Sequence, residues 1–227
     1  RKPGRPIDLR GASGRRGTFQ DLATGVQAVN ATVFIVDDDA SVRKSLARLL
    51  RSEGIETETF ESAPAYLERE AYDGVGCLLL DINMPEMSGV ELQTRLAERG
   101  QTLPIVFLTG YGDVAISVMA MKRGALDFLV KPADRADLLR TVRNALEHHR
   151  RIRAETAIRE SILARVDSLT AREREVMQLV VEGRPNKIIA DQLALSIKTV
   201  EFHRGNVMTK LQVESVADLV KLVLEAN

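Results

Sequence analysis

The chain has 227 residues, and its 32 Lys and Arg balance 32 Asp and Glu, so the formal net charge is zero. This length predicts two modest domains, each able to bury a core of its own. No apolar run approaches the roughly 18 residues of a membrane span, and no apolar signal region follows the basic N-terminus, which favours a cytoplasmic protein. The single cysteine, Cys77, excludes an internal disulfide framework and is expected to be a small core residue.

The zero net charge hides differences along the chain. Residues 1–31 carry six Lys and Arg against two acids, residues 32–147 carry thirteen against nineteen, and residues 167–227 carry eight against nine. Total charge therefore does not by itself indicate a nucleic-acid partner. Residues 1–31 are rich in Gly, Arg and polar residues and lack hydrophobic periodicity, so we expect a disordered leader there.

Residues 32–147 alternate short apolar runs with amphipathic segments, which predicts five β/α units. Strands that are apolar throughout imply burial on both faces, hence a parallel sheet covered by helices, the flavodoxin-like doubly wound α/β architecture. The expected strands are TVFIV, TETF, GCLLL, PIVFL and DFLV, and the expected helices cover residues 41–52, 62–69, 88–99, 113–123 and 134–149.

The remaining residues have a helical pattern. Residues 148–166 continue the last helix or form a linker, and we interpret them as a helical hinge between domains. From residue 167 a small all-α domain of four helices is expected. The first helix begins at a capping box formed by Thr170 and Glu173 and ends at Gly183. Residues 186–194 form the second helix. The third is capped by Ser196 and runs to about Leu211, and residues 215–225 form the fourth.

Polar residues with compatible chemistry follow four of the predicted strands. Asp81 ends an apolar run, at a position that suits a nucleophile, and Asp37 and Asp38 follow the first strand. Since ligands bind beyond the carboxyl ends of parallel strands, these carboxylates should form an all-oxygen cluster suited to Mg²⁺. The Asn83 backbone carbonyl is a further candidate ligand.

Two more strand ends contribute stabilising groups. Lys131 can place an ammonium, and Thr109 a hydroxyl, near a phosphoryl group on Asp81. Taken singly, the aspartate run could only cap a helix, Lys131 could be solvated and Thr109 could be a turn residue. Their coincidence at four strand ends favours a phosphoryl-transfer site.

These strings, VDDD, DINMPEMSG, LTGYGD and GALDFLVKP, resemble the receiver domain of bacterial two-component response regulators. The resemblance covers about residues 32–149 and implies phosphotransfer from a sensor histidine kinase to Asp81, with Mg²⁺ held by Asp37 and Asp38 and a switch through Thr109. It also implies a cis bond before Pro132. Phe128 occupies the family's switch-aromatic position, although a phenylalanine on a strand is more often part of the core.

The C-terminal helices have helix-turn-helix spacing. On the third, the outward set is cationic on balance, as a helix that reads the major groove of DNA requires, while the alternative is an ordinary solvated helix face. The candidate DNA-contacting residues are Lys198, Thr199, Glu201, His203, Arg204 and Lys210. His148 and His149 lie on the basic stretch before this domain and are expected to be solvated or phosphate-contacting rather than metal ligands.

The strings LTAREREVMQLVVEG and NKIIADQLALSIKTVEFHRGNVMTKL resemble the LuxR-type DNA-binding domain. Together with a receiver they resemble the FixJ/NarL family of response regulators, closest to the FixJ branch. The resemblance implies a non-enzymatic, cytoplasmic transcriptional regulator that dimerises on phosphorylation and binds promoter DNA and RNA polymerase.

Two other functions share parts of this pattern. One is a phosphatase or phosphotransferase with an aspartyl-phosphate intermediate, although the haloacid-dehalogenase type of site needs a second acid where this chain has Asn83. The other is a phosphorylation-controlled module that binds protein or RNA, for which duplex preference and salt dependence are the discriminating observations.

Overall fold

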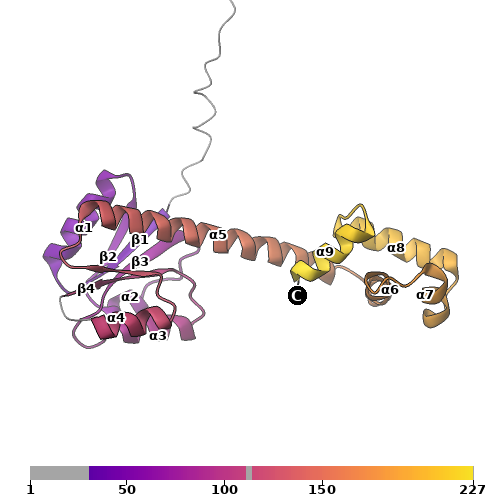
Figure 1. The fold of residues 1–227 in the computed structure, drawn as a ribbon, viewed down its shortest axis with the longest axis horizontal. Helices are drawn as coiled ribbons and strands as arrows, with labels where there is room; N and C mark the ends of the chain where they lie inside the picture. Colours follow the sequence, from indigo (N-terminus) through magenta and orange to yellow (C-terminus); the bar gives the residue numbers. More distant parts are fainter. Residues whose placement is uncertain (1–30, 111–113, 227) are drawn as a thin grey trace, which may run out of the picture.

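The computed structural model describes residues 31–110 and 114–226, so the expected disordered leader lies outside the described residues except for Ala31. Five strands and five helices alternate in the first part of the chain (Figure 1). The strands are β1 (Ala31–Val36), β2 (Glu56–Phe60), β3 (Val75–Asp81), β4 (Ile105–Thr109) and β5 (Asp127–Val130). The helices are α1 (Ala40–Ser52), α2 (Ala63–Leu67), α3 (Gly89–Glu98), α4 (Val114–Lys122) and α5 (Arg135–Asp167).

All strand pairs are parallel, and the order β2-β1-β3-β4-β5 confirms the predicted doubly wound sheet. Central β3 is buried at every residue, as its apolar sequence predicts, and it includes Cys77, which is a core residue. The edge strand β2, with sequence ETETF, is mostly exposed. Its polar residues are tolerated because an edge strand has a neighbour on one side only.

Two apolar cores cover the two faces of the sheet. On one face the strands pack against α1 and α5, through residues such as Leu50, Leu138 and Val142. On the other face they pack against α2, α3 and α4, through Tyr66, Leu92 and Ala120. Because both faces of the sheet are packed against helices, the strands are held in place, and so are the polar residues at their carboxyl ends.

Helix α5 is much longer than the helix expected at residues 134–149. It runs for 33 residues without a break, so the stretch interpreted as a hinge, residues 148–166, is helical throughout. Figure 1 shows α5 leading from the sheet to the C-terminal helices. Near its end Ile162 is 3% exposed and belongs to the C-terminal core, so this one helix is part of both halves of the chain.

The C-terminal helices are α6 (Ala171–Val181), α7 (Asn186–Leu193), α8 (Ile197–Leu211) and α9 (Val216–Ala226). The expected caps are present: Thr170 and Glu173 form a capping box, and the Ser196 side chain accepts the Thr199 N–H. Within the described residues, no helix is both long enough and apolar enough to cross a bilayer.

Candidate functional site

The carboxyl ends of β1 and β3 bring three carboxylates together. One oxygen from each of Asp37, Asp38 and Asp81 lies within 4.8 Å of the others. Asp37 and Asp81 are buried, whereas Asp38 is exposed. This cluster of oxygen donors, open on one side, matches the ligand preference of Mg²⁺. The backbone N–H of Asn83 donates to Asp81 Oδ1 at 3.4 Å, a local contact at the end of β3.

Lys131, which follows β5, reaches the same cluster. Its Nζ lies 2.6 Å from Asp37 Oδ2 and 2.9 Å from Asp81 Oδ2. Burial lowers the pKa of Lys131, but the hydrogen bonds and charges of these two carboxylates outweigh it and raise the pKa overall. The ammonium therefore stays charged and offsets part of the repulsion between the acids.

Burial also raises the pKa of Asp81 above its ordinary value, although Lys131 and the Asn83 N–H act in the opposite direction. Asp81 lies at the end of the buried central strand β3, where its carboxylate is partly removed from water. Desolvation of this kind disfavours the ionised form. Such a group is a poorly solvated nucleophile that depends on nearby cations to remain ionised.

The remaining residues predicted for this site lie on β4 and β5. Thr109 is buried at the end of β4, and its hydroxyl donates to the Gly110 carbonyl at 3.1 Å. Phe128 is 43% exposed, so it is not a core residue. The bond between Lys131 and Pro132 is cis.

A residue that the sequence analysis did not single out packs directly against Asp81. Gly89, the first residue of α3, donates its N–H to the Ile82 carbonyl at 2.9 Å. A Cβ at this position would lie 2.2 Å from the Asp81 carbonyl oxygen. Only glycine permits this approach, and the sequence signal was the final Gly of DINMPEMSG.

On α8 the predicted DNA-contacting residues fall into two groups. Lys198 and Glu201 are exposed, and they share the helix surface with Phe202, an aromatic residue that is 64% exposed. Thr199 accepts or donates a hydrogen bond with the Ser196 hydroxyl at the helix start. The outward surface at the N-terminal part of α8 is available to a partner.

The other residues, His203, Arg204 and Lys210, are half-buried, and the last two are bonded within the domain. Arg204 donates to the Asn186 side chain at 2.6 Å, and His203 Nδ1 is buried. Lys210 differs most from the expected outward position: its Nζ lies 2.6 Å from Glu173 Oε2 and 3.3 Å from the Ser168 carbonyl. Glu173 is buried, and a buried carboxylate needs a cation nearby. Lys210 can supply it because it lies one helical turn after the buried Val207, on the inward side of α8.

The Lys210 hydrogen bond and the Thr170 backbone N–H lower the pKa of Glu173 to about 2. The pair therefore holds α6 against α8 in the ionised state at neutral pH.

Two family models match the chain, each over one of these regions. The response regulator receiver domain matches residues 33–143, and the luxR family of bacterial regulatory proteins matches residues 167–223. The transcriptional regulatory protein TdiR of Thauera aromatica is 43% identical over 197 residues, covering 87% of this chain and 87% of TdiR. This chain belongs to the LuxR/FixJ family of two-component response regulators.

Other members agree with this assignment. The transcriptional regulatory protein FixJ of Rhizobium meliloti is 42% identical over 193 residues, covering 85% of this chain and 95% of FixJ. The solved structure of the response regulator StyR is 44% identical with a TM-score of 0.80, covering 86% of this chain and 99% of StyR. The family combines a receiver with a DNA-binding domain, so the chain is a two-component transcriptional regulator.

Proposed function

We propose that Asp81 accepts a phosphoryl group from a sensor histidine kinase, and that its phosphorylation controls dimerisation and promoter binding. The main support is the position of Lys131 Nζ, 2.6 Å from Asp37 and 2.9 Å from Asp81. This ammonium and the acidic cluster form the charge arrangement that phosphoryl transfer to a carboxylate needs.

In the proposed reaction, an Asp81 carboxylate oxygen attacks the phosphorus of a kinase phosphohistidine. A P–O bond to Asp81 forms and the P–N bond to the histidine breaks, leaving an acyl phosphate. Asp37, Asp38, Asp81 and the Asn83 carbonyl would hold Mg²⁺, which when bound supplies positive charge that offsets the repulsion between the anions. The Lys131 ammonium, which now donates to two carboxylates, would donate to a phosphoryl oxygen in place of one of them.

Thr109 and Phe128 would convert this charge change into a structural change. A new dianion on Asp81 attracts the Thr109 hydroxyl away from the Gly110 carbonyl, which lies 3.1 Å from it. Movement of Thr109 vacates volume beside β4 and β5 that the Phe128 ring would occupy. Its present exposure of 43% leaves the ring free to turn inward and change the surface of the domain.

The N-terminal part of α8 would enter the major groove of duplex DNA. We assign base or phosphate contacts to Lys198, Thr199, Glu201 and His203, with Phe202 beside them as an apolar contact. Arg204 is tied to Asn186 and would contact a phosphate from that fixed position. Lys210 would contact DNA only after its ion pair with Glu173 breaks. The burial of Glu173 opposes this, because the carboxylate would lose its cation.

These roles imply the protein's surroundings. We propose that it acts in the cytoplasm, as a phosphorylation-dependent homodimer that contacts RNA polymerase, and that it catalyses no turnover of a separate substrate. Sustained hydrolysis of a phosphorylated metabolite would instead indicate an enzyme.

The test compares oligomeric mass and duplex-DNA binding with and without beryllofluoride and Mg²⁺, which together mimic a phosphoryl group on Asp81. We expect a mimic-dependent dimer with tighter DNA binding that is absent in Asp81→Asn. The matched control is Asp39→Asn, because Asp39 is adjacent to the cluster but caps α1, a role that Asn also fills. A normal response in Asp81→Asn would refute the assignment of the acceptor.

A further inference from the structure

The outward surface of α8 has an apolar centre. Lys198, Phe202 and Gly205 are spaced by four and then three residues, which places them on one side of an α-helix, and all three are exposed. The buried residues Val200 and Val207 lie on the opposite side. The Phe202 side chain is 64% exposed, so this aromatic ring is presented to whatever contacts the outward side of the helix.

The space beside the Phe202 ring is open. The ring contacts the His203 ring edge-on, with 5.7 Å between the centroids, but His203 is the next residue in the chain and the contact is local. About one turn farther along the helix, a Cβ on Gly205 would meet no atom within 4 Å. A partner can therefore reach both the flank of the ring and the helix backbone at Gly205.

The major groove of DNA offers such a ring one kind of apolar partner. The base edges in this groove present hydrogen-bond donors and acceptors and, on thymine alone, a C5 methyl group. A polar base edge placed against the ring would lose water without gaining a hydrogen bond, which is unfavourable. Contact with the thymine methyl instead removes apolar surface from water on both sides. A phenylalanine that faces the groove thus distinguishes thymine from the other three bases.

We infer that Phe202 is a specificity-determining residue that selects thymine in the operator through the thymine methyl group. This inference rests on the proposed entry of α8 into the major groove. Lys198, one turn before Phe202 on the same side, would contact a phosphate and hold the ring at the base edge. Since Phe202 carries no charge, it contributes to the choice of sequence and not to the salt-dependent part of the affinity.

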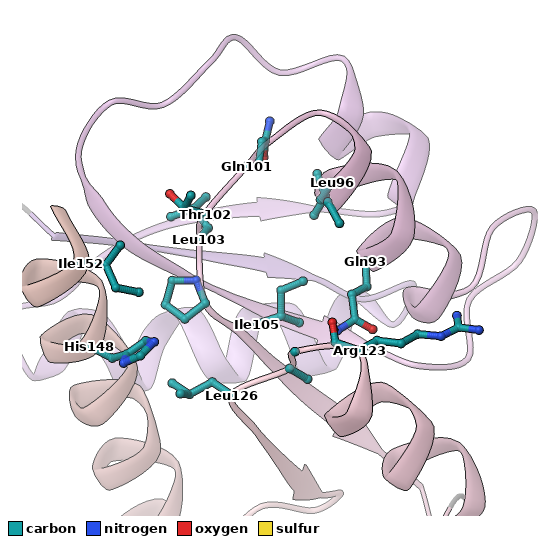
Figure 2. A pocket seen from close by; sticks show the side chains of 14 residues that line it. Gln93, Leu96, Gln101, Thr102, Leu103, Ile105, Arg123, Leu126, His148 and Ile152 are labelled. Carbon is teal, nitrogen blue, oxygen red and sulfur yellow. The ribbon is translucent and has the colours of Figure 1, made fainter. Parts of the chain in front are cut away.

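The receiver contains a hollow that is the main alternative seat for the ring. This cavity, of about 340 Å³, is bordered by apolar side chains such as Leu96 and Leu126 (Figure 2). Its lining also includes Arg123 and His148, so the ring would meet polar groups there. The exposed residues 154–161 of α5 separate the receiver from the C-terminal core. These features favour DNA over the receiver as the partner of Phe202.

The test begins with the full chain, beryllofluoride and Mg²⁺, and a library of DNA duplexes with a randomised centre. We expect the wild-type protein to select duplexes in which thymine is required at a defined position. Phe202→Ala should lose that requirement and keep its preferences at other positions, because the other outward residues of α8 are unchanged.

The decisive comparison replaces the required thymine by deoxyuridine, which removes the methyl group and leaves the hydrogen-bonding groups in place. We expect wild-type affinity to fall roughly fourfold, which corresponds to about 0.8 kcal/mol for one buried carbon group. The affinity of Phe202→Ala should not change. The dependence of affinity on salt should be the same for both proteins, since neither change removes a charge.

The matched control is Ile158→Ala. Ile158 is 60% exposed on α5, so this substitution also shortens an exposed apolar side chain, but away from α8. The variant should keep the wild-type affinity and the wild-type response to deoxyuridine.

Three results would overturn the inference. Equal wild-type binding of the thymine and deoxyuridine duplexes would refute the role of Phe202 and leave the proposed DNA binding intact. Failure of the wild-type protein to select any duplex would refute both. Tighter DNA binding by Phe202→Ala without beryllofluoride would show that the ring is covered within the chain. The deoxyuridine comparison uses the unaltered protein, so it does not depend on the folding of a variant.

Discussion

Replacing Gly89 with Ala should damage the phosphoryl-acceptor site without touching any of its polar side chains. The added Cβ would lie 2.2 Å from the Asp81 carbonyl oxygen and 3.0 Å from Leu80 Cγ. Cβ contacts below 3.0 Å are essentially never observed, so α3 and the end of β3 must separate by at least the missing 0.8 Å (3.0 minus 2.2). Overpacking of this kind costs about 1–3 kcal/mol of stability.

The same displacement acts on the chemistry, since misplacing a reacting group by about 1 Å can reduce a rate by roughly a hundredfold. We expect Gly89→Ala to lower the urea midpoint of the receiver and to weaken beryllofluoride binding in the presence of Mg²⁺. Gly205→Ala is the matched control, because a Cβ there meets no atom within 4 Å and alanine favours a helix interior by about 1 kcal/mol. A Gly89→Ala protein with wild-type stability and wild-type binding would refute the argument.

Three further predictions concern charge. Lys131→Met removes a cation from the acidic cluster, so Mg²⁺ should bind severalfold more tightly by calorimetry; weaker binding would contradict the assigned geometry. Glu173 has a pKa lowered from 4.5 to about 2, so its contribution to stability is present above pH 4.5 and is lost as the pH falls toward about 2. Acid titration of unfolding should show this slope, and Glu173→Gln should lack it, as should Lys210→Met in large part. Burial lowers the pKa of His149 below 6.5, assisted by Arg153, although the Gly76 hydrogen bond opposes the shift. Stability should therefore fall as the pH drops below 6.5, and a His149→Gln protein with the same pH dependence would argue against this.

Much of the acceptor site could be predicted from the sequence because its geometry follows from strand topology. In a parallel sheet the residues after each strand meet at one edge, so Asp37, Asp81 and Lys131 could be grouped before their distances were known. The order of strands decided which ends are adjacent, and it was implied by the doubly wound fold.

Residues whose environment depends on packing between distant segments were harder to predict. His149 was expected to be solvated because its sequence neighbours are basic, yet it lies against Gly76, 73 residues away in sequence. Lys210 was expected on the outer surface of α8 because helical periodicity separates faces but does not reveal that a buried acid, Glu173, lies opposite. Gly89 carries no functional group, so only the space around it shows its importance.

Because α5 is unbroken, its length fixes how the DNA-binding helices are rotated about the helix axis relative to the receiver. Residues 154–161 are all exposed, so this part of the helix packs against neither core. Each residue of an α-helix advances about 100° and 1.5 Å. One residue inserted there would turn the DNA-binding helices by about 100° relative to the receiver, whereas seven would return them to within about 20° of their present orientation, roughly 10 Å farther away. The length of this segment, rather than its side chains, thus determines which way the recognition surface faces.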